Sequence, residues 1–377
     1  MASPSFNRNP LYRQVADFLR EELARDRRPG ERLESEERLA ERFSVSLITI
    51  REALRLLAGE GVIERRHGKG TFVAERDRER DQDRWSAVLI ERDIAHPHAS
   101  FFHMRVAQEV RRILEEQDRP VKLYIGRLRP GEKQDGLTCR EFLTDLSEDR
   151  ISGVVAIDVL QEPSWIDQMR RLRLPLVATN GAQYGHILKL DRERLVREGV
   201  ESLVEGGRRK LAMIGWDEEE ITSSLQIPSY RVLFRKALEE HGLPVDESRI
   251  RTDLHPAYPG GGWEQFRELW AVRSGRPDGL LVCDDLLFRD AATAILDLGV
   301  KVPGELMVAS HANRNSGIFC PFPVEKFEVD PDQTARALVE ILLKAKSGDG
   351  PDSSHRFLPM SRVPASPVVK LREQNDE

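Results

Sequence analysis

Residues 44–62 read SVSLITIREALRLLAGEGV, and this stretch decides how the first part of the chain folds. Ser46 is expected to cap a helix that ends at Glu60-Gly61. The helical spacing of the aliphatic residues predicts one buried face, made of Ile50, Ala53, Leu54 and Leu57. The opposite edge, at the start of the helix, carries polar and arginine side chains and remains free to meet another molecule.

The flanking segments complete a small helical domain that ends in a hairpin. Helical periodicity starts at Leu11 and returns in EERLAERF (36–43), where Ser35 is the expected cap. After the central helix, Val62–Arg66 and Thr71–Val73 are β-prone runs around a glycine-containing turn, which predicts a hairpin. This order is typical of a winged helix-turn-helix, whose third helix enters the major groove of DNA.

We therefore expect the free edge of the third helix and the basic hairpin turn to contact DNA. Arg51 can bind a guanine edge or a phosphate, and Thr49 can contact either. The positive hairpin turn suits the DNA backbone or the minor groove. For Arg55 alone, a solvated helix face is the alternative. The candidate DNA-binding residues are Ser35, Arg38, Ser46, Leu47, Thr49, Arg51, Arg55, Arg66, His67, Gly68, Lys69 and Gly70.

Two motifs in this domain, VS-x-x-T-I-R-x-A-L and G-x-G-T-F-V, resemble the winged helix of GntR-type bacterial transcription regulators. The resemblance covers residues 10–74 and implies DNA contact through Thr49, Arg51 and the glycine turn. The sequence departs from the family where Glu37 and Leu47 replace arginines that contact bases. The operator is therefore expected to differ from the common family operator.

The chain divides after this domain. Residues 75–84, ERDRERDQDR, contain no apolar side chain and are expected to form a charged linker. Residues 1–74 hold 14 basic and 12 acidic residues, whereas the remainder of the 377-residue chain holds 44 and 52. A mildly basic first domain on an acidic body indicates two different tasks.

From residue 85 onward, short apolar runs alternate with helical segments. This pattern predicts an α/β body of parallel sheets covered by helices on both faces. The number of units predicts two lobes, one from about 85–187 and 324–348, the other from about 188–323 and 349–377. Ligands of such folds bind beyond the carboxyl ends of the strands.

Three blocks of the body resemble the sensor domain of LacI-type repressors, which is similar to periplasmic sugar-binding proteins. They are LVEGGRRKLAMIG, SYRVLFRKALEEHGL and RPDGLLVCDDLLFRDAATAILDLGVKVPGELMV. The resemblance implies a polar effector contacted by Arg231 and Asp285, with Asp191 near a crossover between the lobes. A helix-end surface charge for Arg231 and a helix cap for Asp285 are the alternatives.

The family's usual acidic or amide residue is replaced by Ala312, which disfavours a standard pentose or hexose. With the loops that follow the expected strands, the candidate ligand-binding residues are Phe102, Asp158, Asn180, Trp216, Arg231, Asp285 and His311.

Other classes of function find less support. There is no strand-linked GxGxxG, no phosphate-binding GxxxxGK[ST] and no GxSxG, so we expect neither an enzyme nor a cofactor. The three cysteines are far apart, and no run is apolar enough for a signal peptide or membrane helix. The sequence predicts a cytoplasmic homodimeric repressor that binds an inverted repeat in double-stranded DNA and responds to a small polar effector. An enzyme or a degenerate solute-binding domain fused to the same first domain is the alternative.

Overall fold

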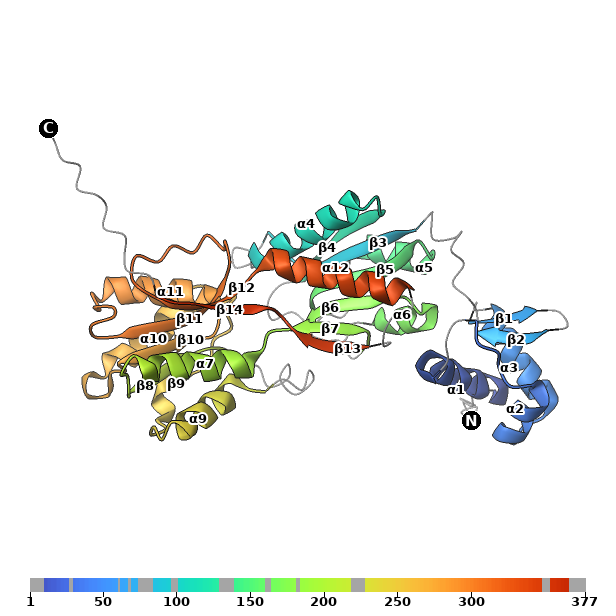
Figure 1. Ribbon diagram of the computed structural model, residues 1–377, viewed down its shortest axis with the longest axis horizontal. Helices are drawn as coiled ribbons and strands as arrows, with labels where there is room; N and C mark the ends of the chain where they lie inside the picture. Colours follow the sequence, from blue (N-terminus) through green and yellow to red (C-terminus); the bar gives the residue numbers. More distant parts are fainter. Residues whose placement is uncertain are drawn as a thin grey trace, which may run out of the picture.

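The computed structural model describes residues 10–26, 30–59, 62–66, 69–73, 84–95, 101–128, 139–159, 164–180, 184–217, 228–347 and 353–365. Figure 1 shows a small N-terminal domain and a larger body of two α/β lobes. The expected linker lies outside the described residues except for Arg84.

The N-terminal domain has the predicted order of three helices and a hairpin. Its elements are α1 (Leu11–Asp26), α2 (Glu36–Phe43), α3 (Leu47–Gly59), β1 (Ile63–Arg66) and β2 (Gly70–Val73). The strands are antiparallel, with Ile63 opposite Val73. The predicted stripe of α3 is fully buried and packs with Val15, Leu19 and Leu39 of the other two helices. This packing fixes which edge of α3 faces outward.

The first lobe is a six-stranded parallel sheet in the order β13-β7-β6-β5-β3-β4. Helices α4 and α12 pack on one face of this sheet, and α5 and α6 on the other. The elements are β3 (Trp85–Arg92), α4 (Phe101–Glu116), β4 (Val121–Leu128), α5 (Arg140–Ser147), β5 (Ile151–Val159), α6 (Ile166–Leu172), β6 (Leu176–Asn180), β7 (His186–Lys189), α12 (Pro331–Ser347) and β13 (Ser354–Phe357).

Strand β3 shows why the sheet is buried on both sides. Val88 and Ile90 point to the core beneath α4 and α12, whereas Ala87 and Leu89 point to the core beneath α5 and α6. A strand with apolar residues on both faces needs a helical layer on each side.

The second lobe repeats this architecture in the order β14-β12-β11-β10-β8-β9, with only β14 antiparallel to its neighbour among the described strands. Helices α7 and α9 cover one face, and α10 and α11 the other. The elements are α7 (Arg192–Glu205), β8 (Leu211–Ile214), α9 (Tyr230–Glu240), η2 (Glu247–Arg249), β9 (Ile250–Arg251), α10 (Gly261–Ala271), η3 (Arg273–Gly275), β10 (Gly279–Val282), α11 (Asp285–Asp297), β11 (Met307–Asn313), β12 (Glu325–Val329) and β14 (Met360–Val363). The predicted fold class is confirmed.

The chain passes between the lobes three times, from β7 to α7, from β12 to α12 and from β13 to β14. Two segments next to the crossings lie in the lobe opposite to the one expected. Residues 324–348 were assigned to the first lobe, but they begin with β12, which pairs with β11 of the second. Residues 349–377 were assigned to the second lobe, but they contain β13, which pairs with β7 of the first. Both strands lie next to a crossing. They are short and contain charged side chains, so their sequences have no apolar run that indicates which sheet they join.

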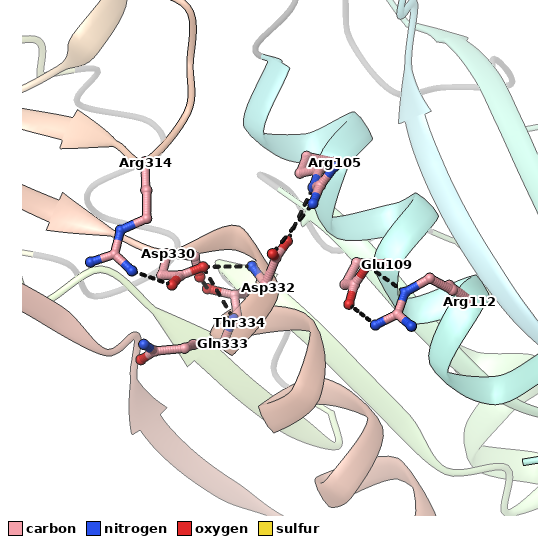
Figure 2. A network of polar contacts seen from close by, with 8 residues as sticks. All are labelled: Arg105, Glu109, Arg112, Arg314, Asp330, Asp332, Gln333 and Thr334. Atoms are coloured by element: carbon pink, nitrogen blue, oxygen red, sulfur yellow. Dashed lines mark hydrogen bonds and ion pairs between the residues drawn. The ribbon is translucent and has the colours of Figure 1, made fainter. Parts of the chain in front are cut away.

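Figure 2 shows polar contacts around the second crossing. Asp330 follows β12 and accepts hydrogen bonds from the backbone nitrogens of Asp332 (2.9 Å) and Gln333 (3.4 Å), so it caps α12. Its other carboxylate oxygen accepts from Nη1 of Arg314 in the second lobe, at 2.8 Å. On the far side, Asp332 binds Arg105 of α4 at 3.0 and 3.3 Å. A continuous set of ion pairs therefore follows the chain across this crossing.

Candidate functional site

The first turn of α3 forms an outward edge of the N-terminal domain. Ser46 caps the helix: its Oγ accepts from the backbone nitrogen of Thr49 at 3.1 Å and lies 2.8 Å from the Thr49 hydroxyl. Leu47 and Ile48 follow and are exposed. Backbone N–H groups at such a helix start suit a phosphate.

Arg51 lies on the same edge and is held by Glu36 of α2. Its Nε donates to Glu36 Oε2 at 2.7 Å, and Arg65 of β1 donates to Glu36 Oε1 at 3.3 Å. This hydrogen bond raises the pKa of Arg51, so its charge is secure. Since Glu36 takes up Nε, both terminal nitrogens of Arg51 can still make a two-pronged contact with a guanine edge.

Sequence reasoning did not find Glu36. The residue stands fifteen positions before Arg51, and only the packing of α2 on α3 brings the two side chains together. The remaining predicted residues of this surface lie around this pair. Ser35 caps α2 through the nitrogen of Arg38 at 3.3 Å, and Arg38 is exposed. Arg55 is also exposed and lies 3.8 Å from Glu52.

The hairpin contributes Arg66, Lys69 and Gly70. Arg66 lies over the Phe72 ring, 4.8 Å from its centroid, and donates to Glu64, whereas Lys69 is exposed. Gly70 has a φ of 116° that disfavours side chains, and a Cβ there would lie 2.9 Å from Arg32 Nε. His67 and Gly68 lie outside the described residues.

In the first lobe, Asp158 at the carboxyl end of β5 contacts several polar side chains. It forms an ion pair with Arg92 at the end of β3, and its Oδ2 lies 3.7 Å from His103 Nδ1. Asp158 has a left-handed φ of 60°, and its backbone nitrogen donates to Thr179 Oγ1 at 2.7 Å. The predicted Phe102 is buried in the core of this lobe. Asn180 ends β6, and its side chain lies outside the description.

In the second lobe, aromatic and basic side chains gather after β8. The Trp216 ring lies 4.9 Å from the His255 ring, centroid to centroid. Arg192 reaches over the same indole at 5.2 Å and over the Tyr230 ring at 4.3 Å. Neither Arg192 nor His255 was predicted, because neither follows a strand end. Arg192 lies at the crossing from β7 to α7, and His255 lies in the irregular loop between β9 and α10.

The ends of β10 and β11 supply acidic and amide groups. Asp284 caps α11 by accepting from the nitrogens of Leu286 (2.9 Å) and Leu287 (3.1 Å), so the cap considered for Asp285 belongs to its neighbour. Asp285 is buried and accepts from Asn313 Nδ2 at 2.8 Å. His311 is also buried, which lowers its pKa, and its Nδ1 has no hydrogen-bond partner among the residues that the structure describes.

Two observations define how the predicted ligand residues come together. Burial lowers the pKa of His255 in the second lobe to about 4, and the charges of Arg92 and Asp158 in the first lobe also act on it, so these groups lie near one another across the lobes. Arg231 instead uses its guanidinium on Glu247 (3.0 Å), Thr252 (3.1 Å) and the Ile250 carbonyl (3.3 Å). We call the set Asp158, Arg192, Trp216, His255, Asp285 and His311 the interlobe site.

Within the described residues, no group of three or more His, Cys, Asp or Glu side chains is arranged to hold a metal ion. None of the helices in that part of the chain combines the length and apolarity that a bilayer crossing requires.

These features define a class of protein in which a winged helix with an outward-facing arginine edge is joined to a two-lobed α/β body. Residues 11–73 match the model for bacterial regulatory proteins of the gntR family, and residues 200–364 match the periplasmic binding protein-like domain. The chain therefore combines a GntR helix-turn-helix domain with a periplasmic-binding-protein-like domain, and both predicted resemblances are confirmed.

The N-terminal domain and the body have different relatives. The mannosyl-D-glycerate transport/metabolism system repressor MngR of Escherichia coli (strain K12) is 46% identical over 67 residues, 18% of this chain and 28% of that protein. The catabolite control protein A of Staphylococcus xylosus is 24% identical over 177 residues, 46% of this chain and 51% of that protein. The chain thus covers only about a quarter and a half of these two relatives.

Solved structures share the fold of the body. The complex of the transcriptional regulator CelR with cellobiose has a TM-score of 0.60 at 17% identity and covers 85% of this chain and 91% of its own. A regulatory protein of the LacI family from Chloroflexus aggregans has a TM-score of 0.61 at 15% identity and covers 75% and 98%.

Proposed function

We propose that the chain is a transcriptional repressor that binds double-stranded DNA through its N-terminal domain and is controlled by a small polar effector in the interlobe site. The observation that carries the proposal is the Arg51 edge of α3, turned outward by the buried stripe behind it and fixed by Glu36. The matches to regulators in both the N-terminal domain and the body support it. They also favour a regulator over an enzyme.

On the DNA side, we propose that Ser46, Thr49 and Arg51 enter the major groove and that Lys69 and Arg66 lie near the backbone. Arg51 reads a guanine, and the helix start binds a phosphate. Leu47 and Glu37, at positions where the GntR family has arginines, supply no such contact. A chain with fewer base-reading arginines needs a different operator.

We propose that the protein works in the cytoplasm as a homodimer. Two N-terminal domains related by a two-fold axis read an inverted repeat whose half-sites lie about 10 base pairs, or a multiple of this, apart. Effector binding rotates the lobes and changes the distance between the two domains. A coupling of about 1–3 kcal/mol between the two sites is enough for regulation.

The experiment is a binding titration of the purified full chain against genomic fragments, including the region upstream of its own gene. Titrations at about 50 and 200 mM salt separate phosphate contacts from base recognition. We expect affinity to fall steeply with salt while the preference for one fragment persists. Equal affinity for all fragments at every salt concentration contradicts DNA-sequence recognition.

A further inference from the structure

Arg192 is the first residue of α7, where the chain crosses from β7 into the second lobe. Its side chain is only 9% exposed, and the rings of Tyr230 and Trp216 hold its guanidinium at 4.3 and 5.2 Å. A positive side chain in the first turn opposes the helix dipole. The helix therefore gives no reason for an arginine at this place.

Within the described part of the chain, Nη1 of Arg192 is buried and has no hydrogen-bond partner. Asp217 Oδ1, with which it forms an ion pair, is 3.9 Å away. Asp217 is engaged with the start of α9. Its Oδ1 accepts from the Tyr230 nitrogen (2.8 Å), and its Oδ2 accepts from the Ser229 hydroxyl (2.8 Å) and the Arg231 nitrogen (3.1 Å).

The other acidic groups at this end of the second sheet are engaged as well. Asp284 caps α11, and Asp285 accepts from Asn313. Both carboxyl groups thus accept from backbone or amide N–H groups, whereas Arg192 has a buried Nη1 that no described residue accepts from. Burying a charged donor without an acceptor is costly, so a bound acceptor at this position gains more than an ordinary hydrogen bond.

This observation deepens the proposed function, on which it rests. We propose that the effector is a polyhydroxylated compound with an anionic group, a carboxylate or a phosphate, and that this group accepts from Arg192. Its hydroxyls donate to Asp285, and its apolar face packs on Trp216. His311 Nδ1 is another buried atom that lacks a partner among the described residues, and the charge of Asp285 acts on this ring.

The test measures the melting temperature of the full chain with inorganic phosphate, glucuronate, glucose 6-phosphate and glucose, each against sodium chloride of equal ionic strength. A ligand that binds the folded state raises the melting temperature by mass action. We expect a rise of several degrees with inorganic phosphate and a larger rise with at least one of the two sugar anions. A response to glucuronate alone of these two identifies a carboxylate site, and a response to glucose 6-phosphate alone identifies a phosphate site.

Two variants assign the effect. Arg192→Met abolishes the rise, whereas Arg235→Met, at an exposed arginine of α9 paired with Glu247, retains it. If Arg192→Met does not fold, Arg192→Lys replaces it: the lysine keeps the charge but loses the fork, and we expect a rise at least halved.

No rise of wild type above chloride, an equal rise with glucose, or a rise unchanged in the Arg192 variants overturns the inference. Operator titrations on the same preparations keep the two proposals apart. If wild type prefers one DNA fragment but shows no anion-dependent rise in melting temperature, only the anionic effector is contradicted. If wild type shows no preference for any DNA fragment, the proposed function is contradicted.

Discussion

At the residue scale, Glu36 links two arginines from different elements. Its two carboxylate oxygens accept from Arg51 of α3 and from Arg65 of the hairpin. An acidic side chain on a DNA-binding surface repels phosphate, so its presence needs a compensating effect. Fixing the guanidinium of Arg51 before DNA arrives is such an effect, because less side-chain freedom is lost on binding.

We therefore predict that Glu36→Gln reduces specificity although it removes a negative charge. Affinity for random DNA should stay equal or rise, while affinity for the preferred fragment should fall about tenfold, within the roughly 1–3 kcal/mol of a two-pronged base contact. Fluorescence anisotropy with both DNAs measures the ratio. Glu41→Gln, the same change at an exposed position of α2, is the matched control. An unchanged ratio in Glu36→Gln would show that Glu36 does not position Arg51.

A second residue-scale prediction concerns pH. Burial raises the pKa of Asp284 to about 7, with a further contribution from the charge of Asp285. The ordinary value is 3.8, so between these pH values the unfolded chain has lost a proton that the folded chain keeps. This group favours the folded state at low pH, and that contribution is lost as the pH rises through about 7.

Asp284→Asn keeps an N-cap but removes the titration. Urea unfolding at several pH values should show that the variant gains stability relative to wild type as the pH rises from about 5, one unit above the ordinary pKa of 3.8, to about 8, one unit above the folded pKa. Parallel curves for the two proteins would mean that Asp284 does not titrate in this range.

Predictability from sequence differs between residues for a physical reason. Arg51, Asp158 and Asp285 could be named because they follow a helix start or a strand end, and those positions show in the periodicity. Glu36, Arg192 and His255 could not, because their roles depend on which elements pack together. Arg231 shows the reverse case: it was named because it stands in a family motif, but Glu247 and Thr252 use its guanidinium.

At the element scale, α3 shows how one helix serves two tasks. Ile50 is completely buried, while Ile48, two residues earlier, is 72% exposed. The two positions lie on opposite sides of the same helix turn. The buried face of α3 thus contributes to stability, and the exposed face is available for DNA contact.

These two isoleucines give a matched test. Ile50→Ala should destabilise the N-terminal domain by about 2–5 kcal/mol, because it leaves a cavity in a small core. Ile48→Ala should change stability by no more than about 0.5 kcal/mol. Calorimetry of the full chain measures both, with the transition of the body as internal reference. Similar losses in the two variants would contradict the orientation of α3.

The elements that sequence reasoning missed share a property. The helices and the central strands were predicted because each carries a long apolar stripe or run. Strands β7, β9, β12, β13 and β14 are short, and each lies near a sheet edge or a crossing between the lobes. Most of them contain polar residues among the apolar ones. Their pairing partners, rather than their own residues, make them strands.

At the scale of the whole molecule, the crossings are where the two lobes communicate. Asp330 binds Arg314 of the second lobe and caps α12, which packs on the first (Figure 2). Because Arg314 binds the carboxylate that caps α12, a movement of the second lobe can be transmitted to a helix of the first. Both ends of this link are side chains that a single substitution removes.

We predict that Arg314→Ala weakens the transmission of effector binding to DNA more than effector binding itself. The effector concentration that releases half of the operator should rise about fivefold or more, the lower end of typical coupling between sites. Lys344→Ala removes an exposed ion pair with Glu340 on the same α12 and should have no effect. Equal effector sensitivity of Arg314→Ala and wild type would exclude this route.

The most direct measurement is dimethyl sulfate protection of the preferred DNA fragment, since this reagent methylates guanine N7 in the major groove. With wild type, we expect protected guanines in two clusters whose centres lie about 10 base pairs, or a multiple of this, apart. With Arg51→Ala, at a protein concentration that still occupies the fragment, one guanine in each cluster should regain reactivity. Binding that protects no guanine, or protection that Arg51→Ala leaves unchanged, would contradict the assignment of α3 as the helix that reads DNA.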